Sequence, residues 1–216
     1  MSTKIWKTIA ALGVLGAAAA ASATPLTLFD VPTGQEVQQT ANRPCIFGDN
    51  SCNAGLLGTY TIFPTAGSPT EYTETQSYSI ETIRLAAGNA FFIGIDVNTT
   101  VAKSEVLDYF RIFDNGVQIY NYEADGVIGN AVDLANGTGF SDWFLKSVDL
   151  TSVIAGHTIR FDVHVTNVVD GREQFFLVPT TNGNPPPGEI PEPGSLALLG
   201  AGLALAGLYR RRNSTK

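Results

Sequence analysis

Histidine and cysteine carry much of the nucleophilic, acid–base and metal chemistry of proteins, and this chain has only two of each among its 216 residues. The histidines, His157 and His164, belong to no H-E-x-x-H zinc motif. The sequence also contains no G-x-S-x-G, no C-x-x-C, no phosphate-binding loop and no dinucleotide-binding glycine pattern. These absences exclude the enzyme classes that the motifs define, and they favour a protein that is not an enzyme and holds no metal.

Basic residues are also few, with 13 Lys and Arg against 20 Asp and Glu and a net charge of −7. The two ends of the chain hold six of the basic residues, so residues 24–190 keep 7 basic against 19 acidic side chains, a net charge of −12. Proteins bind a phosphate backbone through clustered Lys and Arg. The acidic body lacks such a cluster, which excludes nucleic acid as a partner.

Long hydrophobic runs are missing too, and the two short ones lie at the ends of the chain. The first covers residues 9–21 and follows two lysines. The small residues Ala21 and Ala23 lie at its end. A positive leader, an apolar run and an A-x-A site define a secretory signal peptide. About 13 apolar residues are too few for a membrane-spanning helix, which needs roughly 20. We therefore expect residues 1–23 to direct the chain to the Sec machinery and to be cleaved after Ala23.

The second apolar run covers residues 195–209 and contains no charge. As a helix it would be roughly 22 Å long, whereas the hydrocarbon core of a bilayer is about 30 Å thick. Prolines before the run resist extension of the helix, and the arginines after it prefer the cytoplasmic side. We expect a short transmembrane helix that anchors the chain weakly, preceded by a Pro-, Gly- and Asn-rich linker over residues 179–190. The arginine cluster is Arg210, Arg211 and Arg212.

The order Pro191-Glu192-Pro193, apolar helix, arginine cluster resembles the PEP-CTERM sorting signal of Gram-negative bacteria that make extracellular polysaccharide. The resemblance implies that exosortase, an integral membrane enzyme, recognises the Pro-Glu-Pro motif and processes residues 191–216. It also implies transient residence in the inner membrane and then delivery to the cell surface or extracellular matrix. The alternative is an ordinary C-terminal anchor with a fortuitous Pro-Glu-Pro. The resemblance says nothing about the middle of the chain.

The two cysteines, Cys45 and Cys52, lie seven positions apart in the exported body. Export to an oxidising compartment favours a disulfide over two free thiols. A metal site would need further cysteine or histidine ligands, and neither histidine is near in sequence. We therefore predict a Cys45–Cys52 disulfide.

A period of two dominates the middle of the chain, where residues 159–166 and 91–98 alternate apolar and polar side chains. This alternation is typical of strands with one face against a core. Short strands, frequent Gly, Asn and Asp turns and no long amphipathic helix predict one all-β domain over residues 24–178, an antiparallel β-sandwich or jelly roll. Further strands are expected at residues 26–31, 59–63, 78–85, 107–114, 117–122, 143–150 and 174–178.

Asn115-Gly116 separates two of these strands and is the dipeptide best suited to a two-residue type I′ hairpin. Pairing Asp114 with Val117 and continuing outward assigns every side chain to a face. One face then contains Phe110, Ile112, Val117 and Ile119. The other contains Tyr109, Arg111, Phe113, Gln118, Tyr120 and Tyr122.

Aromatic side chains on one face of a sheet can stack against sugar rings, and the set Tyr109, Phe113, Tyr120 and Tyr122 is therefore a candidate carbohydrate-binding surface. The alternative is that this face packs against the other sheet, with Arg111 stacking on a tyrosine.

Two further kinds of site remain open, a calcium site and a pair of catalytic carboxylates. Oxygen ligands for Ca²⁺ occur in turn-like contexts, although Asp, Asn and Gly are what any turn uses. Paired carboxylates for glycoside hydrolysis are assembled by the fold and leave no sequence pattern. His164 could form an acid–base pair with Asp162 beside Thr166, but alternation alone places these residues on a solvated strand face. The candidate calcium ligands are Asp49, Asn50, Asp96, Asn98, Asp170 and Glu173.

The sequence as a whole favours a non-enzymatic, exported β-sandwich protein that takes part in a polysaccharide-rich biofilm or floc, as a structural, adhesive or carbohydrate-binding component. The alternative is a secreted polysaccharide hydrolase.

Overall fold

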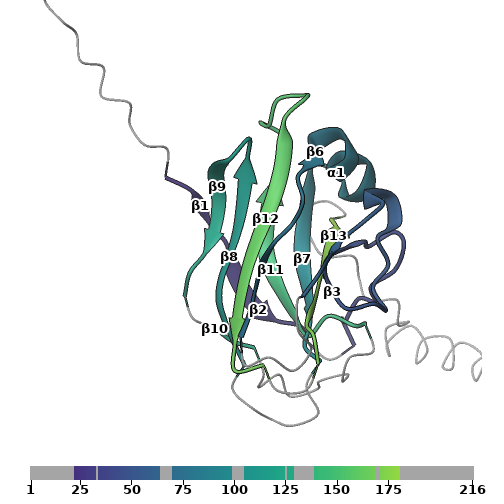
Figure 1. Ribbon diagram of the computed structural model, residues 1–216, viewed down its shortest axis with the longest axis vertical. Helices are drawn as coiled ribbons and strands as arrows, with labels where there is room; N and C mark the ends of the chain where they lie inside the picture. The colour runs from purple at the N-terminus through teal and green to yellow at the C-terminus, as the bar shows by residue number, and fades with distance from the viewer. Residues whose placement is uncertain are drawn as a thin grey trace, which may run out of the picture.

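The computed structural model describes residues 22–32, 34–63, 70–98, 105–124, 126–128, 139–168 and 171–180. Within them the chain is mostly β and forms two sheets that face one another (Figure 1). Sheet A has the strand order β1-β9-β8-β12-β5, with β10 also paired to β8 and β6 to β12. Sheet B has the order β2-β11-β7-β13-β3-β4.

The strands of sheet A are β1 (Thr24–Pro25), β5 (Thr70–Glu74), β6 (Tyr78–Ser79), β8 (Val106–Asp114), β9 (Val117–Tyr122), β10 (Gly126–Val127) and β12 (Thr158–Thr166). Those of sheet B are β2 (Thr27–Asp30), β3 (Cys45–Gly48), β4 (Thr61–Ile62), β7 (Ala90–Asp96), β11 (Trp143–Asp149) and β13 (Gln174–Pro179). The helical elements are the 3₁₀ helix η1 (Gly55–Leu57) and the helix α1 (Ile80–Ala87).

Four antiparallel pairs are nested one inside the next along the chain. The innermost is β8 with β9, followed outward by β7 with β11, β5 with β12 and β3 with β13. The turn of the innermost pair is Asn115-Gly116, where φ is positive at both residues, at 45° and 82°. Positive φ at both central positions defines a type I′ turn. The predicted hairpin and its Asp114–Val117 pair are therefore confirmed.

The main core lies between the two sheets and is built from their alternating residues. Phe110 of sheet A stacks on Phe175 of sheet B at a centroid distance of 5.8 Å, and Phe47 meets Phe110 edge to face at 6.4 Å. All three rings are fully buried. The prediction of a mostly β fold with two packed sheets is thus confirmed.

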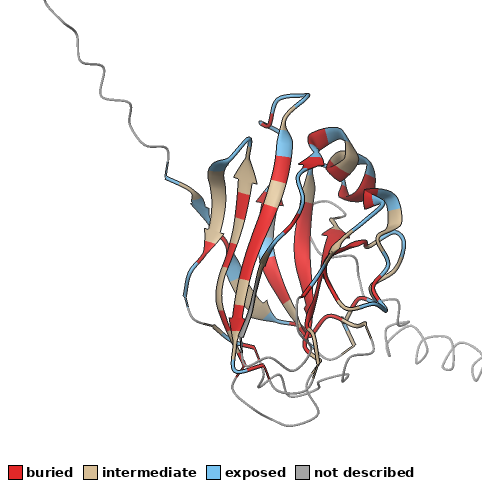
Figure 2. Cartoon of the chain, in the orientation of Figure 1, coloured by how far each residue is buried: buried red, intermediate tan, exposed pale blue. Residues whose placement is uncertain are grey.

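The two sheets differ in how much they bury. Sheet B is covered on both sides, because a second buried cluster lies on its outer face and includes Phe92, Phe144, Phe176 and Val37. Sheet A alternates instead between buried and half-buried residues along β8 and β12. Figure 2 shows this difference along β7 and β12. A strand that is buried on both faces reads as a continuous apolar run, which accounts for neighbouring pairs such as Phe175 and Phe176.

Helix α1 occupies residues that the sequence pattern predicted as a strand, so that prediction is wrong. The Ser79 hydroxyl accepts the Thr82 N–H at 3.1 Å and caps the first turn. Ile80 and Ile83 are buried three positions apart on one side of the helix. Gly88, at a φ of 78°, ends it. The cap and the helical spacing outweigh the weak alternation that favoured a strand.

Purely antiparallel sheets were also a wrong expectation, because both sheets are mixed. Strand β1 runs parallel to β9 at one edge, and β4 runs parallel to β3 at another. Each parallel pair involves only two residues of either strand. Short edge strands of this kind cover exposed backbone groups that would otherwise pair with another chain. The sequence pattern also missed β3 and β5.

The predicted disulfide is confirmed, since Cys45 and Cys52 are bonded across a Cα–Cα distance of 5.9 Å. Both residues belong to the cluster on the outer face of sheet B. The bond also fills the space above Gly48, where an added Cβ would lie 2.3 Å from the Cys52 sulfur.

Among the described residues no helix is long and apolar enough to cross a membrane. The predicted signal peptide up to Ala21, almost all of the linker and the C-terminal helix lie outside those residues. Strand β13 extends through Pro179, and the Thr180 N–H donates to the Ala90 carbonyl, so the ordered strand runs into what the sequence predicted to be linker.

Replacing both cysteines by serine should lower the free energy of unfolding by about 2.5 kcal/mol, because the bond restricts a loop of about eight residues in the unfolded chain. Urea denaturation of oxidised and doubly substituted protein measures the difference. Gly48→Ala should also destabilise the oxidised protein, because the new methyl group would collide with the disulfide sulfur of Cys52. An unchanged midpoint in the double variant would contradict the stabilising role of the bond.

Candidate functional site

The outer face of sheet A presents a row of polar and aromatic side chains from β8 and β12. Antiparallel pairing sets Tyr109 opposite His164, Arg111 opposite Asp162 and Phe113 opposite Arg160. Side chains that are two residues apart on a strand share a face, so these six residues form one surface, which we call the β8–β12 surface. All are half-buried except Asp162, which is buried.

Tyr109 lies at the centre of a stacked group on this surface. Its ring is 5.4 Å from the His164 ring at an interplanar angle of 23°, and the Arg111 guanidinium lies 3.9 Å from its centroid. Nδ1 of His164 is 2.6 Å from Oδ2 of Asp108. The Arg111 Nε–H in turn donates to Glu123 at 2.8 Å. The contact of the Arg111 cation with the aromatic face, together with the Arg111–Glu123 ion pair and the His164–Asp108 contact, fixes the orientation of these side chains.

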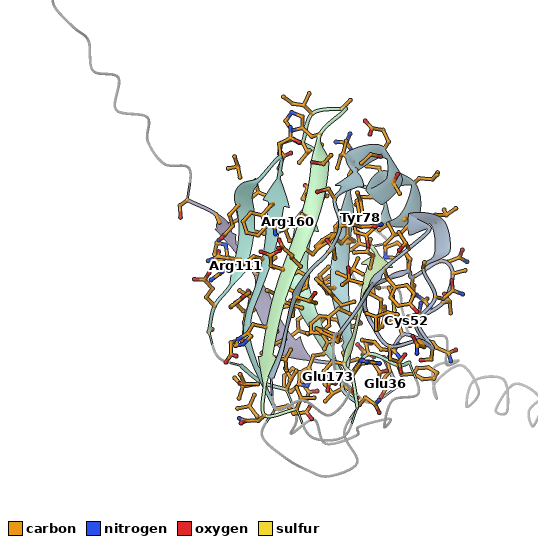
Figure 3. The ribbon with its side chains drawn as sticks, in the orientation of Figure 1. Glu36, Cys52, Tyr78, Arg111, Arg160 and Glu173 are labelled. Carbon is orange, nitrogen blue, oxygen red and sulfur yellow. A yellow bond between two sulfur atoms is a disulfide. The ribbon has the colours of Figure 1, made fainter. Side chains whose placement is uncertain are left out.

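Phe113 forms the second half of the surface with Arg160, whose guanidinium lies 4.4 Å from the ring centroid. Arg160 also pairs with Asp162 at 2.9 Å and with Glu74. Burial raises the pKa of the Asp162 carboxyl, and the charge of Arg160 opposes that rise. Arg111 and Arg160 are seen over neighbouring strands in Figure 3.

The predicted aromatic set is divided by a register shift in the hairpin. Pairing changes between Ile112 and Phe113, so that Phe113 lies opposite Gln118 and Ile112 opposite Tyr120. The extra residue on β9 is Ile119, and a bulge of this kind exchanges the faces of the residues beyond it.

Tyr120 and Tyr122 therefore lie on the same side as Phe110 and Ile112. Tyr122 is buried within the main core, and Tyr120 packs against it. The Tyr120 hydroxyl also donates to the Asp149 carbonyl at 2.7 Å and accepts the Asp149 N–H at 3.1 Å. The structure thus brings Tyr109 and Phe113 together and separates both from Tyr120 and Tyr122.

The β8–β12 surface offers both hydrogen-bond donors and acceptors beside flat rings. Its guanidinium, imidazole and carboxylate groups match the hydroxyl groups of a sugar, which donate and accept together. Sequence reasoning assigned Tyr109 and Phe113 to this surface, considered His164 only as an acid–base partner of Asp162, and missed Arg160 and Asp108. The cross-strand register is the signal that joins them, and it cannot be read from one strand alone.

Most of the candidate calcium ligands converge at the opposite end of the sandwich from the hairpin turn. The Asn98 N–H donates to Glu173 at 2.6 Å, and the Gln174 side chain donates to Asp49 at 3.4 Å. Asp142, which sequence analysis missed, accepts the Val97 N–H at 2.7 Å. These carboxylates bind backbone and amide N–H groups. Asn50 is exposed, and Asp170 lies outside the described residues.

Asp96 is a carboxyl at this end whose pKa is strongly shifted. It is fully buried, and one of its oxygens accepts the Gly139 N–H at 3.0 Å. Burial, with the nearby charge of Asp142, raises its pKa to about 7. Among the residues that the structure describes, no group of three or more His, Cys, Asp or Glu side chains is placed to hold a metal ion.

A pocket lies between the hairpin turn and the loop that joins β11 to β12. Its volume is about 260 Å³, and Asp114, Asp149, Tyr120 and Ser152 are among its lining residues. Asp114 is paired with His157 at 2.7 Å. Hydrogen bonds from Thr151 lower the pKa of the Asp149 carboxyl, which keeps it ionised.

The C-terminal tail matches the family model of the PEP-CTERM protein-sorting motif over residues 189–213. The resemblance noted on Pro191, Glu192 and Pro193 is therefore confirmed, and it indicates an exported protein that exosortase sorts to a surface or extracellular destination in Gram-negative bacteria. Comparison of the chain with curated proteins and with solved structures finds no match.

Replacing Asp96 by asparagine should reduce the pH dependence of stability. Because the folded-state pKa of Asp96 is raised to about 7, the unfolded chain loses this proton at lower pH than the folded protein does. The free energy of unfolding therefore falls as pH rises from about 4 to about 7, by up to about 1.4 kcal/mol per pH unit.

Urea denaturation at pH 4, 5, 6 and 7 tests this effect. The difference between Asp96→Asn and wild type should shift steadily in favour of the variant as pH rises. A difference that is constant across the series would show that Asp96 ionises in the folded protein as it does in the unfolded chain.

Proposed function

We propose that the protein is a non-enzymatic component of the bacterial surface or extracellular matrix, and that the β8–β12 surface contacts polysaccharide. The observation that carries the proposal is the ordered row Tyr109–His164, Arg111–Asp162 and Phe113–Arg160 on a sheet face that the rest of the core does not use. The sorting tail supports it by placing the domain outside the cell.

The arrangement of the row favours contact with a chain of sugars over insertion of one ring between aromatic planes. The Tyr109 ring already stacks with His164 and Arg111, and Phe113 with Arg160. Recognition would therefore rest on hydrogen bonds from guanidinium, imidazole and carboxylate groups, with the ring edges as apolar contacts. Charge-assisted hydrogen bonds are stronger than neutral ones, and several along two strands suit an extended ligand.

The strand arrangement supports a jelly roll as the finer description of the fold. Four nested pairs correspond to one long hairpin folded over into two sheets, and the eight strands involved divide equally between them. Jelly rolls are eight-stranded double sheets. This topology leaves one sheet face available for a ligand.

The alternative proposal is a polysaccharide hydrolase that uses the pocket beside the hairpin turn. Two carboxylates, Asp114 and Asp149, line it. Asp149, held ionised, would suit the carboxylate role, while Asp114 would have to act as the acid from its pair with His157. Release of reducing ends from host polysaccharide, lost in Asp149→Asn, would favour this alternative over a binding function.

Binding of the exported protein to extracellular polysaccharide from its own host tests the preferred function. Tyr109→Ala and His164→Ala should each weaken binding about tenfold or more in affinity electrophoresis, a loss of about 1.4 kcal/mol. The matched control is Leu85→Ser, on α1 and away from the β8–β12 surface. Equal mobility shifts for wild type and both surface variants would contradict the assignment of this surface, provided that their unfolding midpoints agree.

Sorting by the tail is tested with Pro191, Glu192 and Pro193 all changed to alanine. The variant should remain in the inner membrane fraction, because exosortase no longer recognises it, while wild type reaches the surface with its tail processed. Cell fractionation and mass spectrometry of the C-terminal peptide measure both properties. Normal surface delivery of the variant would refute the role of the motif.

A further inference from the structure

Both ends of the described chain leave the sandwich from the same end. Thr24 pairs with Tyr120, the fourth of the six residues of β9, and β1 runs parallel to β9, so the residues before Thr24 lead toward the hairpin turn. Thr180 donates from its N–H and its hydroxyl to the carbonyl of Ala90, the first residue of β7. Asp149 pairs with Ala90 and also contacts Tyr120, which joins the two exit points.

This end, which we call the terminal end, consists of the hairpin turn at 115–116, the β11–β12 loop at 150–157 and helix α1. The Asn115 N–H donates to the Thr158 carbonyl, and the Ile80 N–H donates to the His157 carbonyl. These bonds hold the three parts side by side, as they appear in Figure 1.

The three most exposed large apolar side chains of the described residues belong to the terminal end. They are Leu85 of α1, Ile154 of the loop and Val117 beside the hairpin turn, which are 72%, 66% and 60% exposed. At the opposite end of the sandwich, Ile62 and Val127 are less exposed, at 44% and 40%.

The charged groups of the terminal end are engaged with one another or with the backbone. Glu81 accepts the Gly156 N–H at 2.8 Å, and Asp114 is paired with His157. Arg84 donates to the carbonyls of Leu150 and Val153 at 2.9 and 2.7 Å. The aliphatic side chains therefore project from a surface whose polar groups already have partners.

The chain outside the sandwich limits how far this end can lie from a bilayer. The apolar run of the predicted signal ends at Ala21, and three residues at about 3.4 Å each bring Thr24 within roughly 10 Å of it. On the other side, residues 181–194 separate the sandwich from the apolar run of the sorting tail and reach at most about 50 Å. Before cleavage the signal therefore keeps the terminal end close to the membrane, and afterwards the tail limits its distance from the bilayer to about 50 Å.

We infer that the terminal end is a membrane-contact surface, on which Leu85, Ile154 and Val117 enter the interface of a zwitterionic phospholipid bilayer while the chain is anchored. The net negative charge of the body disfavours anionic lipid, so the contact is apolar in origin and each side chain gains from burial. The inference does not depend on polysaccharide binding, which uses a different face.

Hydrogen exchange of the full chain, anchored by its tail in vesicles of phosphatidylethanolamine and phosphatidylcholine, tests the inference. Peptides covering 115–118 and 150–157 should exchange about tenfold more slowly in wild type than in the triple variant Leu85→Ser, Val117→Ser, Ile154→Ser. The double variant Ile62→Ser, Val127→Ser, altered at the opposite end, should retain the wild-type rates.

Two comparisons separate membrane contact from loop stability. Wild type that is released from the vesicles by proteolysis of the linker should exchange as fast as the anchored triple variant at these peptides. Protection should also persist at high salt, because it is apolar. Equal rates for anchored and released wild type, or protection that disappears at high salt, would overturn the inference, and polysaccharide binding by the triple variant should be unchanged in either case.

Discussion

The positive backbone angles at Asn115 and Gly116 are the constraint on which the rest of the fold depends. A two-residue turn fixes which residues of β8 and β9 lie opposite one another. The three outer pairs then form around this one, and in each of them a strand that follows the turn pairs with a strand that precedes it. Cross-sheet packing of Phe47, Phe110 and Phe175 closes the structure once these pairs have formed.

The difference between the two sheets explains where function can reside. Sheet B is covered by the segment that contains the disulfide, and its outer face is a second core. The outer face of sheet A carries charged and aromatic side chains, and stacking and ion pairs between them fix their orientations. A surface arranged in this way loses little conformational entropy when a ligand binds, because its long side chains are already held.

Alternation and turn chemistry were enough to predict most of the long strands, the hairpin and the disulfide. They failed where a single residue or a local cap decided the outcome. Ile119 inserts one position into β9 and moves Tyr120 and Tyr122 into the core side, which no pattern in β9 reveals. The cap at Ser79 likewise converts an alternating segment into α1. The ring that stacks on Tyr109, His164, comes from β12, more than fifty residues away, and only the sheet register brings the two together.

The position of β13 has a consequence for the timing of maturation. This strand is the last in sequence of those described, yet it lies inside sheet B, between β7 and β3. Sheet B therefore stays split into two parts until Pro179 has been translocated, when only the linker and the apolar tail remain to follow. A brief halt of that tail in the membrane would give the domain time to insert β13 into sheet B before exosortase processes the tail.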